Sequence, residues 1–209
     1  MSFFIAPVVE GHTEQQCLER LLHRIWRELL DRTERLQVLA PFRGKRDEFI
    51  HANGEALGAM VQKAHFDLLA KSRRIIDSRR LVLVLLDAEG DCPAELAPRL
   101  LQNATTAQAN ADIACVIAKR MFENWIAAGA STLAGINGMP QPLLPPDSIE
   151  DRSGVAWLGE QMRSVNPRRR YKKTIDALHF IKAFNVADCR VNSPSFRKLC
   201  RDLEKWAQP

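Results

Sequence analysis

Three carboxylates follow one apolar segment of the chain. The segment Leu81–Leu86 is aliphatic throughout, which predicts a β-strand buried on both faces. Asp87, Glu89 and Asp91 come directly after it. Because side chains at alternate positions of an extended backbone point the same way, we expect these acids to converge. Like charges this close are costly unless a cation neutralises them, and carboxylate oxygens suit Mg²⁺ or Mn²⁺. The alternative is a polar turn in which Gly90 lets the chain bend.

A second acidic segment follows the apolar run Phe3–Val9. Glu10 ends this predicted strand, and Glu14 lies in the first turn of the helix expected after it. Thr13, with the glutamine three residues later, has the spacing of a helix capping box. The helix dipole alone accounts for an acid at Glu14, but it does not account for Glu10 at the tip of a buried strand. Two strand ends that both carry acids therefore predict one shared metal site.

The elements that position these acids are strands alternating with helices, which predicts a parallel sheet with right-handed crossovers. We expect four strands, at 3–9, 36–40, 81–86 and 113–118. We expect helices at 14–30, 54–78, 94–109, 121–128, 155–165, 174–184 and 196–206. Neither a glycine-rich dinucleotide fingerprint nor a Walker A loop occurs in the strand-to-helix turns. ATP chemistry would therefore belong to a partner.

The acidic segments Val9-Glu-Gly-His-Thr-Glu14 and Asp87-Ala-Glu-Gly-Asp91 resemble those of the Toprim domain, and in particular of Toprim-like proteins related to the OLD (overcoming lysogenization defect) nucleases. Phe122–Trp125 and Ser193–Phe196 are similar to shorter segments of the same family. The resemblance implies an α/β Toprim-like fold with a mostly parallel four-stranded sheet flanked by helices and a C-terminal helical extension. It also implies a metal-dependent nuclease, acting in prokaryotic anti-phage defence beside an AAA- or ABC-type ATPase.

The resemblance also implies roles for individual residues. Glu10, Asp87 and Glu89 would be catalytic, and Glu10 would also transfer a proton. The expected ligands of one or two Mg²⁺ or Mn²⁺ ions are Glu10, Glu14, Asp87, Glu89, Asp91 and Glu123. Glu89 departs from the family pattern, in which aspartate is commoner. Glu123 follows a later strand, and its alternative role is an acid on a helix surface.

The segment 168–173 concentrates positive charge on the C-terminal part of the chain. The net charge is +5, and cations that neutralise phosphates give salt-sensitive, sequence-independent affinity. We expect a nucleic acid (DNA or RNA) to contact Arg168, Arg169, Arg170, Tyr171, Lys172 and Lys173. The alternatives are a solvated surface for the cations and a buried anchor for Tyr171. Lys119, Arg120 and Lys173 are candidates for the cation beside the scissile phosphate.

Length and composition favour a globular chain of 209 residues. Proline and glycine interrupt regular structure between about 131 and 151, so we divide the chain into a Toprim-like metal-binding domain, 1–130, and a helical extension, 131–209, that packs on it. No apolar stretch is long enough to span a bilayer, which predicts no contact with a membrane. The five cysteines are scattered without a Cys-x-x-Cys pair, which favours the cytoplasm.

Two other classes of function stay open at this point. The chain could be a non-catalytic regulatory or binding subunit of an ATPase complex, with the fold retained and no metal bound. It could instead be a phosphotransfer protein, because receiver and haloacid-dehalogenase domains also carry acids after buried strands. The second class is disfavoured, since the Asp-x-Asp-x-Thr pattern is absent and position 91 is an aspartate.

Overall fold

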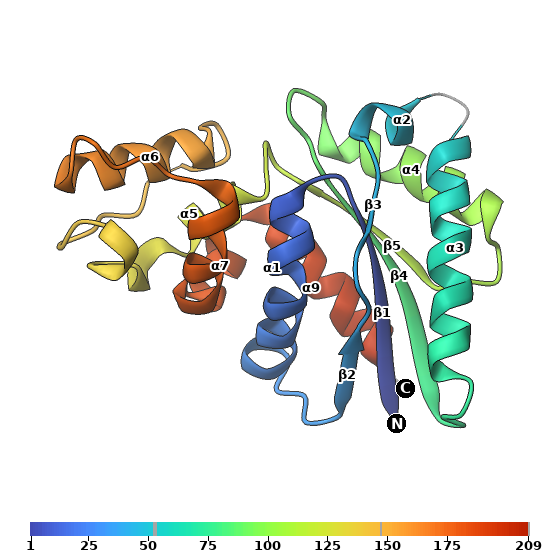
Figure 1. Ribbon diagram of the computed structural model, residues 1–209. Helices are drawn as coiled ribbons and strands as arrows, with labels where there is room; N and C mark the ends of the chain where they lie inside the picture. Colours follow the sequence, from blue (N-terminus) through green and yellow to red (C-terminus); the bar gives the residue numbers. More distant parts are fainter. Residues whose placement is uncertain (52–53, 147, 209) are drawn as a thin grey trace.

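Five parallel strands form the centre of the protein, in a computed structural model that describes residues 1–51, 54–146 and 148–208. The sheet has the order β2-β1-β4-β5 (Figure 1). The strands are β1 (Ser2–Val9), β2 (Arg35–Val38), β3 (Phe42–Arg43), β4 (Ser78–Asp87) and β5 (Ile113–Ala118). The predicted parallel α/β architecture is confirmed. The sheet gains one strand over the expected four, because β3 resumes the pairing with β1 after the break that contains Pro41.

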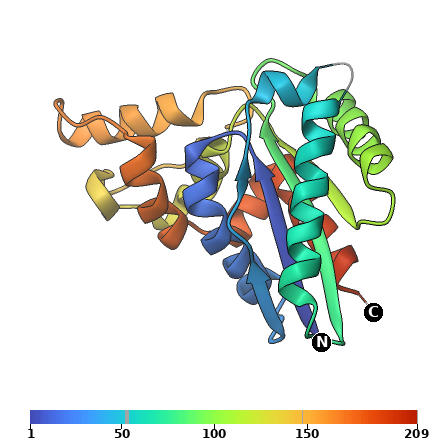
Figure 2. The same ribbon diagram turned by 45° about the vertical axis from the view of Figure 1, so that its right-hand side comes forward.

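Strand residues alternate between two hydrophobic clusters, one on each face of the sheet. Along β1, Phe3 and Ile5 belong to the cluster on one face, and Phe4 and Ala6 belong to the other. Helices α1 (His12–Arg24) and α9 (Pro194–Ala207) cover the first face, and α3 (Glu55–Ser72) and α4 (Pro93–Ala107) cover the second (Figure 2). Because successive side chains of each strand point to opposite faces and both faces are covered by helices, the sheet is buried on both sides.

The remaining helices are shorter. They are the π-helical turn η1 (Ile25–Leu29), α2 (Arg46–Ile50), α5 (Glu123–Ala128), the 3₁₀ turns η2 (Ala130–Thr132) and η3 (Ile136–Gly138), α6 (Gly154–Val165), α7 (Lys173–Ala183) and α8 (Val186–Asn192). The expected helix at 54–78 ends at Ser72, because β4 already begins at Ser78. The capping box at Thr13 is wrong: α1 starts at His12, two residues before the expected helix, its N-cap is Gly11, and no side chain caps it.

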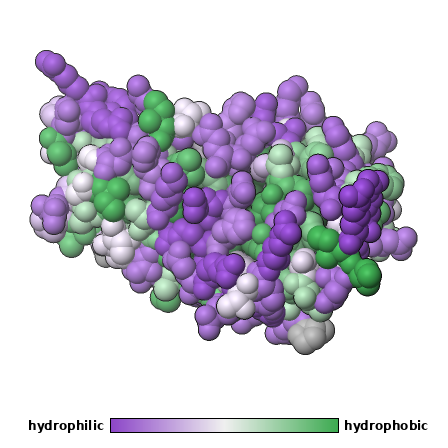
Figure 3. Space-filling view, turned by 60° about the horizontal axis from the view of Figure 1, so that its bottom comes forward, coloured by the Kyte–Doolittle hydropathy of each residue, from purple (hydrophilic) through white to green (hydrophobic). Residues whose placement is uncertain are grey.

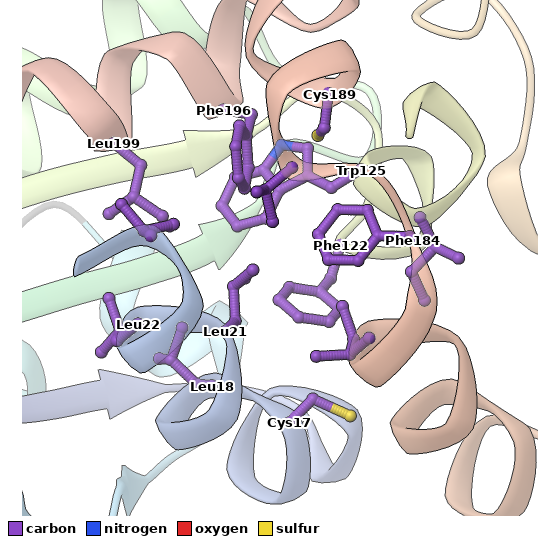
Figure 4. Packing of buried hydrophobic residues seen from close by; sticks show 14 of the residues in the cluster. Cys17, Leu18, Leu21, Leu22, Phe122, Trp125, Phe184, Cys189, Phe196 and Leu199 are labelled. Carbon is purple, nitrogen blue, oxygen red and sulfur yellow. The ribbon is translucent and has the colours of Figure 1, made fainter. Parts of the chain in front are cut away.

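The helices after residue 130 pack on α1 and on the sheet. Aromatic rings of α5 and α9 lie against one another, with ring centroids of Trp125 and Phe196 5.3 Å apart. Leu18 and Leu21 of α1 and Phe184 belong to the same cluster (Figure 4). This hydrophobic cluster therefore contains residues from both sides of position 130. The division of the chain into a domain, 1–130, and an extension, 131–209, stays a prediction.

The carboxyl ends of the strands point toward the top of Figure 1, and both chain ends lie at the bottom. Hydrophilic residues cover most of the face seen when that bottom side is turned forward, with smaller separate hydrophobic areas (Figure 3). No helix in the described ranges has the length and apolar content needed to cross a membrane.

Candidate metal centre

The order of the strands creates a switch point between β1 and β4. From β1 the chain crosses by α1 to β2 on one side, and it then returns by α3 to β4 on the other side of β1. In open parallel sheets, ligands bind at the carboxyl ends of strands where the direction of crossover changes. Glu10 directly follows β1, and Asp87 is the last residue of β4. The two acids therefore lie at the place where such folds carry their sites.

Three carboxylates meet at this switch point. Glu10, Glu14 and Asp87 each offer an oxygen, and these three oxygens lie within 4.8 Å of one another. The Asp87 backbone N–H donates to Glu10 Oε1 at 2.5 Å, which ties the two strand ends together. Asp87 Oδ1 in turn accepts from the backbone N–H of Phe122 at 2.7 Å. Glu14 is buried, and the other two are half-buried. The predicted convergence of Glu10, Glu14 and Asp87 is present in the structure.

Glu123 adds a fourth acid close to the three. Its side chain is fully buried at the start of α5. Its Oε1 accepts from the Thr13 hydroxyl at 3.4 Å and faces the Lys173 ammonium at 3.4 Å. Its Oε2 is shielded from solvent and has no hydrogen-bond partner within the described parts of the chain. The surface-acid alternative for Glu123 does not hold, since a buried carboxylate oxygen without a partner is costly and calls for a ligand.

Burial raises the pKa of all three clustered carboxylates. The pKa of Glu14 rises to about 7, chiefly through desolvation and then through the nearby charges of Glu123 and Glu10. Desolvation also raises the pKa of Glu10, although the Asp87 N–H and Arg46 oppose it. The pKa of Asp87 lies well above its ordinary value, because desolvation and then the charges of Glu14 and Glu10 raise it. Three adjacent carboxylates repel one another when all are ionised. A divalent cation, which prefers hard oxygen ligands, would relieve this repulsion.

The raised pKa of Glu14 predicts that the metal-free protein loses stability as pH rises. Between the ordinary value of 4.5 and about 7, the folded state keeps a proton that the unfolded state has released. The free energy of unfolding should therefore fall across this window, by up to about 3 kcal/mol. Urea unfolding in EDTA at about pH 5 and about pH 7.5 measures the change. Glu14→Gln should make the fall shallower, because only Glu10 and Asp87 then keep a raised pKa, while Glu19→Gln, on the exposed side of α1, leaves the profile intact. A wild-type profile that rises would contradict the assignment.

Gly11 leaves the space that the Glu14 carboxylate occupies. Its backbone lies at φ −101°, which any residue can adopt, but a Cβ at this position would collide with Glu14 Oε2. We expect Gly11→Ala to displace Glu14 and to weaken divalent-metal binding at least about tenfold, measured by calorimetry. Gly90→Ala is the matched control in the other acidic turn, because a Cβ there meets nothing within 4 Å. Equal metal affinity of the two variants would contradict the role of Glu14.

Glu89 and Asp91 do not join the three clustered oxygens, contrary to the expected convergence after β4. The strand ends at Asp87, and Glu89 has a left-handed backbone with φ 50°. The alternation of an extended chain therefore stops before either acid. Both turn toward Arg46, which pairs with Asp91 and lies 3.7 Å from Glu89. Their roles as ligands, and that of Glu89 in catalysis, stay predictions.

Arg46 is the site residue that the sequence did not identify. As the first residue of α2, it donates to the backbone carbonyls of Asp87 at 3.0 Å and Ala88 at 3.1 Å. It thus holds the turn that carries the acids of β4. It is separated from that turn by about forty residues, and it stands in the sequence as one of several cations in a loop. No local pattern marks a contact of this kind.

The basic segment 168–173 divides into buried and exposed members. Arg169 pairs with the buried Asp176 at 2.5 Å, and Lys173 with Glu123. Tyr171 stacks on Phe180 with ring centroids 6.2 Å apart, and its hydroxyl is shielded from solvent. This packing favours the buried-anchor alternative for Tyr171. The exposed side chains are those of Arg168, Arg170, Lys172 and Lys173.

Comparison with known proteins gives one match. A family model described as Domain of unknown function (DUF4276) matches residues 9–204. The matched segment contains every acid of the site and the whole basic segment. No curated protein and no solved structure matches the chain.

Proposed function

We infer the function of the chain from its acidic site, because the chain belongs to the DUF4276 family, which carries no functional description. We propose a Toprim-like, divalent-metal-dependent nuclease that hydrolyses phosphodiesters. The observation that carries the proposal is the group of three carboxylate oxygens within 4.8 Å at the switch point of a parallel sheet. Carboxylates in that position are suited to bind Mg²⁺ or Mn²⁺, the usual partners of phosphate substrates.

Each residue of the proposed centre has a part. Glu10, Glu14 and Asp87 would hold the ion, and Glu123 would ligate a second one through its unpartnered oxygen. A bound ion would supply a nucleophilic hydroxide near neutral pH and stabilise charge on the phosphate. Glu10 combines a raised pKa with partial exposure, which suits a residue that takes up and releases a proton.

The exposed cations at Arg168, Arg170 and Lys172 are proposed to contact the nucleic-acid backbone. These residues come just before Lys173, whose ammonium lies beside Glu123. The phosphate backbone of a nucleic acid bound along them would therefore reach the acidic site. The partner ATPase and the part in anti-phage defence that the resemblance implies stay predictions.

Removing these three cations should weaken nucleic-acid binding without touching the acids. We expect the combined Arg168→Gln, Arg170→Gln and Lys172→Gln variant to bind a fluorescent oligonucleotide less tightly and with a shallower dependence on salt. Fluorescence anisotropy at several salt concentrations measures both. The same three changes at Arg20, Arg27 and Lys182 are the control, since these side chains are also exposed. An unchanged salt slope in the first variant would remove this segment from the proposal.

The nuclease proposal is tested by incubating the full chain with plasmid DNA and with tRNA in Mn²⁺ or Mg²⁺. Cleavage is expected in the presence of metal, and EDTA should stop it. Glu10→Gln should abolish cleavage and keep the fold, because glutamine can still accept the Asp87 N–H. Cleavage that survives in Glu10→Gln or in EDTA would refute the assignment of the centre.

A further inference from the structure

A cavity lies between the start of α4 and the start of α9, against the edge strand β5. Its volume is ≈ 390 Å³, within the range of small-molecule sites. The walls are largely apolar, with Pro93, Ala97, Ile117 and Pro194 among them. Apolar walls of this kind suit the faces of a flat, uncharged group.

Three charged side chains line this cavity: Lys198 pairs with Asp202, and the other two are Lys119 and Glu150. Glu150 Oε1 is shielded from solvent and has no partner within the described segments. Burial raises the pKa of Glu150, while Lys119 and hydrogen bonds from Ser195 and Ser193 oppose the rise. Lys119 enters no ion pair among the residues that the structure describes. Among the described residues, the cavity therefore offers one carboxylate oxygen without a hydrogen-bond donor and one ammonium without an ion-pair partner.

The cavity and the acidic site share one piece of backbone. Lys119 follows Ala118, which is the cross-strand partner of Asp87. The turn that carries the acids bonds to the same segment, with Ala88 N–H donating to Ala118 O at 2.9 Å and Glu89 N–H to Arg120 O at 2.8 Å. The cavity wall at Lys119 is therefore one residue beyond the strand position that pairs with Asp87.

We propose that this cavity receives an unpaired nucleobase of the substrate, next to the phosphodiester held at the acidic site, and that guanine fits it best. Guanine carries two adjacent donors, N1–H and the 2-amino group, for the Glu150 carboxylate, and its O6 accepts from Lys119. A base that enters must leave its stack and its pair, so a single-stranded region is the expected substrate. The inference rests on the proposed nuclease function, and it adds a preference for the sequence that is cut.

Nucleosides in EDTA test the cavity apart from the metal centre, because they carry no phosphate. Guanosine should bind the full chain more tightly than adenosine, cytidine or uridine, as followed by nuclear magnetic resonance titration. Glu150→Gln should weaken guanosine at least about tenfold, and Ala97→Trp, which fills the cavity, should abolish binding. Asp87→Asn should bind guanosine as the wild type does. No guanosine binding, or equal affinity of the wild type and Glu150→Gln, would overturn the inference.

Cleavage of single-stranded oligonucleotides that contain one guanine separates this inference from the nuclease proposal. We expect the wild type to cut beside the guanine. In Glu150→Gln this cut should be lost or displaced. Metal-dependent cutting whose position ignores the guanine would overturn the inference and leave the nuclease function standing. Guanosine binding that depends on Glu150, without cutting of any substrate, would refute the nuclease function and leave a nucleoside site.

Discussion

Asp87→Asn is expected to abolish metal-dependent cleavage, by at least about a thousandfold or about 4 kcal/mol of activation free energy. The same change should stabilise the metal-free protein near neutral pH. Asparagine keeps the acceptor for the Phe122 N–H and removes one of three charges that repel one another. A gain of about 1 kcal/mol corresponds to a rise of about 2–4 °C in the melting temperature of a chain of this size.

Calorimetry with and without Mn²⁺ measures both effects of Asp87→Asn. The wild type should gain about 2.7 kcal/mol at a metal concentration about a hundred times the dissociation constant, and the variant should gain far less. Asp112→Asn is the control, because Asp112 is an exposed aspartate on the loop before β5. If Asp87→Asn destabilises the metal-free protein, repulsion among the three carboxylates is contradicted, and if the variant gains as much stability from Mn²⁺ as the wild type, the metal centre is refuted.

Lys173→Met is expected to separate metal binding from catalysis. The Lys173 ammonium lies 3.4 Å from Glu123 Oε1, and its charge lowers the pKa of Glu10 and of Glu14. A cation so placed can offset the charge that develops on a phosphate, a contribution worth about 10²–10³ in turnover. Its removal also takes a positive charge away from the place where a metal ion would bind. We therefore expect turnover to fall by that factor and metal affinity to rise.

Lys172→Met is the matched control for this prediction. Lys172 is the adjacent cation and is also exposed, and it has no ion pair in the described part of the protein. It should lower binding of nucleic acid slightly and leave turnover at saturating substrate unchanged. Equal losses of turnover in the two variants would mean that Lys173 acts only through the charge of its segment.

Much of the fold could be predicted because buried strands and amphipathic helices carry regular apolar patterns. The strands β1, β4 and β5 and the helices α1, α3 and α4 all lie where these patterns place them. The short elements β3, α2 and α8 were not predicted. A helix as short as α2 or a strand of two residues carries too few apolar positions to mark a period, and tertiary contacts decide its conformation.

The candidate site divides in the same way. Glu10, Glu14 and Asp87 lie on regular elements, so the rule that parallel strands end at one edge was enough to bring them together. Glu89 and Asp91 lie beyond the end of β4, where a left-handed residue redirects the chain. Thr13 looked like a local cap but serves Glu123, more than a hundred residues away. Contacts of this length leave no trace in local spacing.

The ion pair of Glu123 with Lys173 joins α5 to the first residue of α7, on opposite sides of the proline-rich loop. All the acids of the centre precede residue 130, but this cation follows it. A shortened chain that stops at 130 would keep every acid of the centre but lose the cation that pairs with Glu123, together with helices that pack on α5. The proposed metal centre therefore depends on residues from both sides of the loop, and grafting the first half of the chain onto another protein would transfer the carboxylates without Lys173.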